Sequence, residues 1–287
     1  MIIPCLNEGD HLRQTVESLC ACKVRPDEII IVDNGSSDGC SDFIERENYA
    51  VPTQLFKLSA PLGVSKARNF GAERATGEIL VFVDAHVLFP ETWIKSIQNA
   101  LRNQAVGIAA PGGKAWGNPR ATCFGYRLKN LKLEIDYLRW KGLTPYAVPM
   151  VPGFCQAFRK DLFQQIGGYD AGMINYGMED TEICIRLWLL GYQVQIIPNI
   201  LVTHLFRPRF PYEVSWTNLI YNSLRTVHAH FNSERVERAI AELKSLPDFD
   251  NAVNLLNTSD IWDRRRNLES IRQHDDSWFF EKFGMKL

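Results

Sequence analysis

The sequence predicts an α/β fold with a mostly parallel sheet flanked by helices. Short apolar runs alternate with helical patterns over the first two-thirds of the chain, as in strand–helix–strand units. Beyond residue 212 the composition becomes helical and ends in an aromatic run. A chain of 287 residues, 46% hydrophobic and 23% charged, is long enough for one large domain with an appendage. We therefore expect a domain over residues 1–212 and a helical extension over residues 213–287 packed on it.

The elements of the N-terminal part follow from apolar spacing and turn residues. Asn7 is a candidate cap for a first helix, in which Leu12, Val16 and Leu19 recur at helical spacing. A turn-rich cluster at residues 33–39 ends the second strand. In chain order we expect a strand at residues 2–3, the helix after Asn7, strands over 28–32 and 54–58, a helix over 65–75, a strand over 78–83 and a helix that starts at Pro90.

The pattern loosens between residues 111 and 152, where prolines, glycines and aromatic residues interrupt it. One helix-like stretch is expected there, over residues 128–140. Because binding segments are often irregular, this region is a candidate for acceptor specificity. Regular spacing then returns, and we expect a strand over 156–158, helices over 161–166 and 180–190, and a strand over 194–197.

Composition excludes several classes of partner. The net charge is −1, so no global basic field attracts nucleic acid, and we expect no nucleic-acid partner. The longest apolar stretches, at residues 79–83 and 106–110, fall far short of the ~18 residues that cross a bilayer. The first residues also lack the basic segment of a signal peptide. Seven scattered cysteines indicate free thiols in a reducing compartment. We expect a cytoplasmic protein, with peripheral membrane association as the alternative.

Two familiar phosphate-binding motifs are missing from the sequence. There is no Walker-type loop, and no Gly-x-Gly-x-x-Gly follows the first strand. A nucleotide diphosphate would therefore need a metal and basic side chains to balance its charge. Lys66 and Arg68 are candidates for that role, and a solvated helix face is the alternative reading of both.

Polar residues follow several of the predicted strands: Asp33, Asp84, His86 and His204. In open α/β sheets ligands bind outside the carboxyl ends of the strands. Asp84 and His86, two residues apart in extended chain, point the same way, and one carboxylate with two imidazoles suits a divalent cation. The alternatives are hydrogen-bonded histidines at strand ends and a non-haem iron oxygenase site, which the alternation of helices and strands disfavours.

Several segments resemble glycosyltransferase family 2, whose members have the GT-A fold and use nucleotide-diphosphate sugars. They are IPCLNE at residues 3–8, VDNGSSD at 32–38, ARNFG at 67–71 and GEILVFVD at 77–84. Within that superfamily, DAH at 84–86, GYDAGM at 168–173, EICIRLW at 182–188 and HLFR at 204–207 look most similar to the catalytic domain of polypeptide N-acetylgalactosaminyltransferases. The resemblance covers about residues 2–212.

The resemblance implies a set of site residues. Asp84, His86 and His204 would bind Mn²⁺, with Mg²⁺ or another divalent ion as the alternative. Asp33 would contact the uracil and Arg207 the diphosphate. The full nucleotide-sugar-binding set is Pro4, Asn7, Glu8, Asp33, Lys66, Arg68, Asp84, Ala85, Gly153 and Arg207.

Glu179 and Asp180 stand where the N-acetylgalactosaminyltransferases have Trp-Gly-Gly-Glu-Asn, and the Glu-Asp pair is similar to that of inverting family 2 enzymes. Asp180 would then be the general base that takes the proton of an acceptor hydroxyl. Glu179 would hold a hydroxyl of the sugar or the acceptor. The alternative is that both acids only stabilise the first helical turn, by roughly 0.3–1 kcal/mol.

These observations predict a metal-dependent glycosyltransferase that moves a hexose or N-acetylhexosamine from a UDP-sugar to an unidentified acceptor, with inversion favoured. The acceptor is a saccharide, a peptide or a small molecule. One alternative is a nucleotidyltransferase, which would normally have a glycine-rich basic loop where Asn7 and Glu8 stand. The other is a catalytically silent nucleotide-sugar-binding module.

Overall fold

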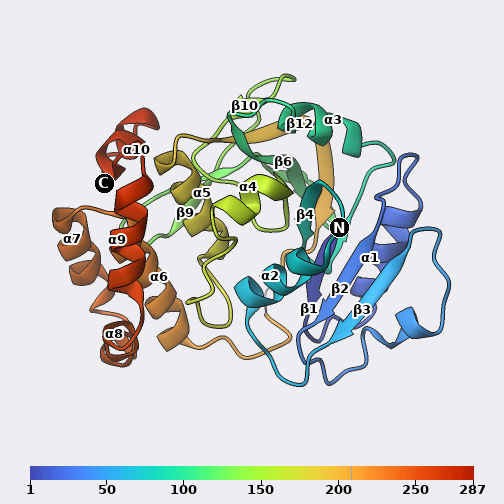
Figure 1. Ribbon diagram of the computed structural model, residues 1–287, viewed down its shortest axis with the longest axis horizontal. Coiled ribbons are helices and arrows are strands. Elements are labelled where there is room, and N and C mark those ends of the chain that lie inside the picture. Colours follow the sequence, from blue (N-terminus) through green and yellow to red (C-terminus); the bar gives the residue numbers. More distant parts are fainter. Residues whose placement is uncertain (208) are drawn as a thin grey trace.

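The computed structural model describes residues 1–207 and 209–287. A central sheet separates two groups of helices, and the C-terminal helices α6–α10, orange to red in Figure 1, lie at the end of the molecule away from β1–β3. The large sheet has ten strands, in the order β10-β12-β6-β11-β4-β1-β2-β3, with β5 paired to β12 and β7 to β6. The predicted α/β fold with flanking helices is therefore confirmed.

Parallel pairing joins β1 to β2 and β4, β2 to β3, and β6 to β12, whereas β11 runs antiparallel between β4 and β6. Strands β8 and β9 form a separate two-stranded sheet. The strand bounds are β1 Ile2–Cys5, β2 Ile29–Asp33, β3 Thr53–Lys57, β4 Ile79–Val83, β5 Val87–Leu88, β6 Val106–Ala115, β7 Asn118–Cys123, β8 Tyr126–Leu128, β9 Ile135–Tyr137, β10 Tyr146–Ala147, β11 Cys155–Arg159 and β12 Gln193–His204.

The helices cover both faces of this sheet and form the C-terminal part (Figure 1). Their bounds are α1 His11–Cys20, η1 Asp42–Glu45, α2 Val64–Arg74, α3 Ile94–Leu101, α4 Lys160–Gln165, α5 Glu179–Leu189, α6 Trp216–His230, α7 Ser233–Leu243, α8 Phe249–Asn257, α9 Ile261–Ile271 and α10 Asp276–Lys282. Within the described part of the chain, no helix combines the length and apolarity needed to cross a bilayer.

The core explains why the central strands read as continuous apolar runs. Every residue of β2 is buried, as expected for a strand covered on both faces. Helix α2 packs unusually close to the sheet, because a Cβ on Gly71 would lie 2.5 Å from Ile2 Cγ2. This glycine brings α2, and with it Arg68, close against β1.

The predicted C-terminal helices are present and pack on the rest of the protein. Phe231, directly after α6, and Phe279 and Phe280 of α10 belong to the same buried cluster as residues of the central sheet. Phe283, which follows α10, packs edge-on against Trp188 of α5, with ring centroids 5.0 Å apart. The division of the chain at residue 212 stays a prediction.

Four local predictions were wrong. Residues 128–140 form no helix, because β8 and β9 pair across a turn there. Asn7 does not cap α1: it has a left-handed φ of 56°, and the helix begins four residues later, at His11, with Asp10 at the cap position. Helix α3 begins at Ile94 rather than at Pro90. The strand expected over 194–197 continues as β12 to His204, since pairing with β6 and β5 extends it.

Candidate active site

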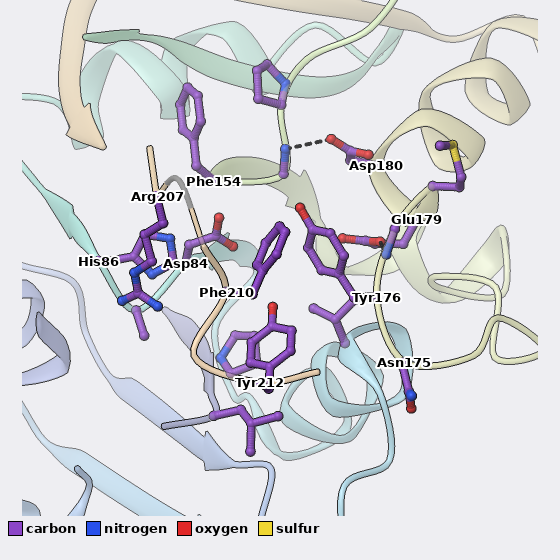
Figure 2. A pocket seen from close by; sticks show the side chains of 18 of the residues that line it. Asp84, His86, Phe154, Asn175, Tyr176, Glu179, Asp180, Arg207, Phe210 and Tyr212 are labelled. Atoms are coloured by element: carbon purple, nitrogen blue, oxygen red, sulfur yellow. Dashed lines mark hydrogen bonds between the residues drawn. The ribbon is translucent and has the colours of Figure 1, made fainter. Parts of the chain in front are cut away.

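A cavity of about 650 Å³ opens at the carboxyl ends of β1 and β4. Residues that follow those strands form one wall, and the first turn of α5 forms another. Figure 2 shows Asp84 and His86 on one side and Glu179 and Asp180 on the other. The cavity therefore lies at the edge of the sheet where polar residues after the strands were expected to bind a ligand.

Asp84, His86 and His204 converge at this cavity. Each offers one ligand atom, and the three atoms lie within 4.8 Å of one another. Asp84 and His86 follow β4, and His204 is the last residue of β12, which pairs there with Val87 of β5. His204 Nε2 lies 3.4 Å from Asp84 Oδ2. Sequence spacing alone did not decide whether these three side chains meet, and in the folded protein they do.

The chemistry of this cluster fits a divalent cation. Both ring nitrogens of His204 are buried without a hydrogen-bond partner among the described residues, which is costly unless a ligand engages them. Burial lowers the pKa of His204, so its imidazole is neutral, the form that binds metals. Burial alone would raise the pKa of Asp84, but the contacts with His204 and Arg68 outweigh it and hold that pKa well below its usual range.

Glu8 orients two residues of the same wall. His86 Nδ1 lies 3.0 Å from Glu8 Oε2, and Arg207 also donates to that carboxylate. A carboxylate on one ring nitrogen leaves the other free to face a metal, a common arrangement around ligating histidines. Glu8 itself is only 6% exposed and lines the cavity, and its contact with a nucleotide sugar stays a prediction.

Arg68 connects the two sides of the cavity. Its guanidinium donates to Asp84 Oδ1 at 3.0 Å and to the Gly153 carbonyl at 2.9 Å. Its Nη1 lies 3.6 Å from Glu179 Oε1. Because the Arg68 side chain is 1% exposed, the reading of this residue as part of a solvated helix face was wrong. Arg68 supplies a fixed positive charge between the Asp84 side of the cavity and Glu179 on the other side.

The first turn of α5 presents Glu179 and Asp180 to the cavity. Asp180 Oδ2 accepts a hydrogen bond of 3.0 Å from the Gly153 amide, drawn in Figure 2. Burial raises the pKa of Glu179 to about 7. The charge of Arg68 lowers this pKa, and the neighbouring charge of Asp180 raises it further. Burial likewise raises the pKa of Asp180. Carboxylates with raised pKa values are better proton acceptors near neutral pH.

The family described as Glycosyl transferase family 2 matches residues 1–167. The chain belongs to glycosyl transferase family 2. A second family, described as the N-terminal domain of galactosyltransferase, matches residues 140–208.

The relatives of this family 2 chain include polypeptide N-acetylgalactosaminyltransferases. Polypeptide N-acetylgalactosaminyltransferase 11 from Xenopus tropicalis is 27% identical over 233 residues, which cover 70% of this chain and 37% of the relative. Polypeptide N-acetylgalactosaminyltransferase 10 from Homo sapiens is 23% identical over 314 residues, which cover 100% of this chain and 49% of the relative. The chain thus spans about a third to a half of the length of these curated relatives.

Solved structures confirm the predicted GT-A fold of this family 2 member. GalNAc-T7, crystallised with UDP, GalNAc and Mn²⁺, has a TM-score of 0.78 at 20% identity, covering 99% of this chain and 56% of that one. The mannosyltransferase PcManGT from Pyrobaculum calidifontis, with GDP-Man and Mn²⁺, has a TM-score of 0.53 at 18% identity, covering 94% and 73%. At these identities the likeness establishes the fold alone.

The structure brings most of the family 2 site residues together. The cavity is lined by Pro4, Glu8, Arg68, Asp84, Ala85, His86, Gly153, Glu179, Asp180, His204 and Arg207. Gly153 lies where a Cβ would approach Arg68 Nη2 to 3.2 Å and Asp180 Cβ to 3.4 Å. A larger residue there would crowd both groups, which accounts for the glycine.

Three residues of the expected set do not line the cavity: Asn7, Asp33 and Lys66. Asp33 accepts hydrogen bonds from the Ser36 amide at 2.8 Å and from the Ser41 hydroxyl. Asn7 Oδ1 accepts from the Ser37 amide at 2.8 Å, and the Lys66 side chain lies on the exposed face of α2. The geometry gives these three the role of loop or surface residues, and their contact with a nucleotide stays a prediction.

Sequence reasoning missed an aromatic group inside the cavity. Tyr176, Phe210 and Tyr212 lie between the two walls in Figure 2. The Tyr176 and Phe210 ring centroids are 4.8 Å apart, and those of Phe210 and Tyr212 are 5.6 Å apart. Phe210 is 46% exposed. The run of aromatic residues just after His204 was the only signal in the sequence, and it has no spacing that predicts a site.

Proposed function

We propose that this chain is a metal-dependent glycosyltransferase, which moves a hexose or N-acetylhexosamine from a UDP-sugar to a hydroxyl of an acceptor. The observation that carries the proposal is the composition of one cavity. Asp84, His86 and His204 offer a cation site on one wall, and two acids with raised pKa values face it from the other. This is the pairing that inverting transfer from a nucleotide-diphosphate sugar uses: a place for the pyrophosphate and a proton acceptor.

Mn²⁺ is the cation we propose. One carboxylate oxygen and two imidazole nitrogens suit Mn²⁺ better than Mg²⁺, which prefers oxygen ligands. When bound, such a cation supplies Lewis-acid stabilisation of the departing diphosphate. Arg207, held by Glu8, adds a positive charge on the same wall.

The acids of α5 would act on the acceptor side. Asp180 would take the proton of the attacking hydroxyl, with one carboxylate oxygen anchored on the Gly153 amide. An attack assisted in this way, from the side opposite the leaving diphosphate, inverts the anomeric carbon, and inversion is the outcome we propose. Glu179, beside Arg68, would hold a hydroxyl of the sugar or the acceptor.

The test is release of UDP from a panel of UDP-sugars, with and without Mn²⁺ and with candidate acceptors. We expect Mn²⁺-dependent release from one UDP-hexose or UDP-N-acetylhexosamine, abolished by EDTA, and NMR of the product to show the inverted anomer. Pyrophosphate release from a nucleoside triphosphate would instead identify a nucleotidyltransferase. Tight binding of UDP-sugars without turnover, across all acceptors, would identify a silent binding module.

The acceptor and the location are further proposals. Because several relatives carry polypeptide N-acetylgalactosaminyltransferase in their names, a peptide rich in Ser and Thr is the first acceptor to test, before saccharides and small molecules. We propose a cytoplasmic location, with the membrane periphery as the alternative. Cell fractionation followed by immunoblotting distinguishes the two.

A further inference from the structure

Asn222 of α6 makes an unusually complete set of hydrogen bonds to a loop far away in the sequence. Its Oδ1 accepts from the Ile174 amide at 2.9 Å. Its Nδ2 lies within hydrogen-bond distance of three carbonyls, those of Ile174 at 2.9 Å, Tyr176 at 3.2 Å and Gly177 at 3.0 Å. Asn222 is fully buried. One side chain therefore holds half of the eight backbone N–H and C=O groups of residues 174–177.

The loop held by Asn222 enters the active site at two places. On one side, the Gly177 amide donates to Glu179 Oε2 at 3.0 Å, at the start of α5. On the other side, the Asn175 carbonyl accepts from the Val64 amide at 2.7 Å, at the start of α2. Helix α2 carries Arg68, and α5 carries Glu179 and Asp180. The loop is thus the common support of the groups that meet at Gly153.

The backbone of this loop needs such support. Asn175 and Met178 have left-handed φ angles of 53° and 74°, which residues other than glycine seldom adopt. The packing is tight as well, because a Cβ on Gly63 would lie 2.8 Å from the Asn175 amide nitrogen. A conformation of this kind persists when surrounding contacts over-determine it, and the Asn222 side chain provides four of those contacts.

We infer that Asn222 is a positioning residue of the transfer reaction: from the C-terminal helical part, it sets the relative position of Arg68 and the acids of α5. The expected effect of Asn222 on turnover rests on the proposed function, whereas its effect on the loop does not. The three cation ligands are placed mainly by strands, since Asp84 and His86 follow β4 and His204 ends β12, and Asp84 alone of the three contacts Arg68. Loss of Asn222 is expected to slow turnover without weakening binding of the nucleotide and metal.

The test compares Asn222→Ala with Ser223→Ala. Ser223 is the next residue of α6 and is also buried, but its hydroxyl donates to the Leu219 carbonyl of its own helix at 3.0 Å. We expect Asn222→Ala to lower kcat by about 100-fold, the cost of displacing reacting groups by about 1 Å. We expect its Kd for UDP with Mn²⁺ to stay within threefold of the parent value. Ser223→Ala should leave both unchanged.

Hydrogen exchange tests the same inference without activity. In Asn222→Ala, the amides of residues 172–180 should exchange at least tenfold faster, while those of β1, β2 and β4 keep their rates. Unchanged exchange at 172–180 would overturn the inference. So would full kcat, or a loss of UDP and Mn²⁺ binding in proportion to the loss of turnover, which would mean general destabilisation.

Two provisions keep the outcomes separate. If Asn222→Ala does not fold, Asn222→Ser, which keeps a small hydrogen-bonding group, replaces it with the same expectations at smaller amplitude. If the parent protein shows no turnover with any UDP-sugar, the proposed function fails, and the exchange measurement still decides whether Asn222 holds the loop.

Discussion

Helix α5 carries acids into two different environments, one turn apart. Glu179 is 5% exposed and Glu182 is fully buried. Glu182 lies 2.9 Å from Arg186 Nη2, 2.7 Å from Arg264 Nη2 and 3.0 Å from His230 Nε2. Among the residues that the structure describes, Glu179 pairs with one cation, Arg68, whose Nη1 lies 3.6 Å from Glu179 Oε1. The two acids thus share burial and differ in the charge that compensates it.

The difference in compensation determines the protonation of each acid. Burial would raise the pKa of Glu182, but Arg186 and Arg264 outweigh it and hold that pKa well below its usual range. Burial raises the pKa of Glu179 to about 7, because Arg68 does not offset both burial and the Asp180 charge. An acid fully compensated by arginines stabilises a structure, whereas an under-compensated acid in a cavity is available for proton transfer.

The ion pairs around Glu182 lie where the C-terminal helices meet the rest of the protein. We call the connected set of Asp170, Glu182, Arg186, Arg225, His230, Asp260 and Arg264 the junction network. Arg225 of α6 donates to both oxygens of Asp170, at 2.8 and 2.9 Å. Its Nη1 donates to Asp260 at 2.7 Å. Asp170 lies in the segment that leads to the loop held by Asn222. The junction network and the active site are therefore neighbours with opposite charge balance.

The largest effect that separates the two regions is expected from His204→Ala. Loss of one ligand should lower Mn²⁺-dependent transfer by about 10³-fold or more, since metal stabilisation of the leaving group is worth several kcal/mol. The stability should change less than the activity, because the loss of the contact with Asp84 is partly offset by the removal of two buried ring nitrogens that lack a hydrogen bond among the described residues. Initial rates across a Mn²⁺ titration and a melting curve measure both quantities.

The control for this variant is His274→Ala. His274 stacks on Trp278 at 3.7 Å and is not among the residues that line the cavity. Its substitution should leave the Mn²⁺ dependence unchanged. Full activity of His204→Ala at low Mn²⁺ would contradict the cation site.

Glu182→Ala tests the junction network and should show the reverse pattern. Removing one partner from a buried ion network costs about 3–5 kcal/mol, because the arginines are left uncompensated. Urea unfolding should therefore show a lower free energy of unfolding, while kcat per folded molecule changes less than tenfold. Glu269→Ala is the matched control, since the Arg265–Glu269 pair is partly exposed and worth about 1 kcal/mol or less. A loss of kcat in Glu182→Ala as large as in the cavity variants would erase the distinction between the two regions.

Asp180→Asn distinguishes a catalytic acid from one that only stabilises a helix start. Loss of a general base should lower kcat by at least about 10²-fold, with the Kd for UDP and Mn²⁺ unchanged. Asp161→Asn is the control, because Asp161 stands in the first turn of α4 and is 79% exposed. That control should lose only the helix-dipole effect, about 0.3–1 kcal/mol of stability. Equal kinetics for the two variants would refute the catalytic assignment.

The smallest expected effect is a pH dependence of stability from Glu179. Its pKa is raised from 4.5 to about 7 in the folded protein, so the folded state holds a proton that the unfolded state releases. Stability should fall as pH rises from 5 to 7, by on the order of 1 kcal/mol. Glu179→Gln, measured in EDTA by thermal unfolding, should reduce this slope. A parent protein whose stability rises through that window relative to the variant would show that Arg68 compensates Glu179 after all.

Local patterns were sufficient for the strands and most helices near the site. The buried runs of β2 and β4 have the continuous apolar character of strands covered on both faces. Residues 128–140 were predicted wrongly because β8 and β9 are held by pairing with each other, and short strands have weak intrinsic preferences. Asn7 was misplaced because its left-handed turn, and not a helix cap, positions the polar residues after β1.

The sequence by itself predicted the α/β class, the family and the convergence of Asp84, His86 and His204, because residues at the ends of neighbouring strands meet at one edge of a sheet. Only the tertiary structure decided which acids of α5 are compensated, since Arg264 and His230 reach Glu182 from helices about 50 to 80 residues away. It also decided that Asn222 supports the loop before Glu179. Burial and charge balance depend on groups distant in the chain, and no local pattern contains them.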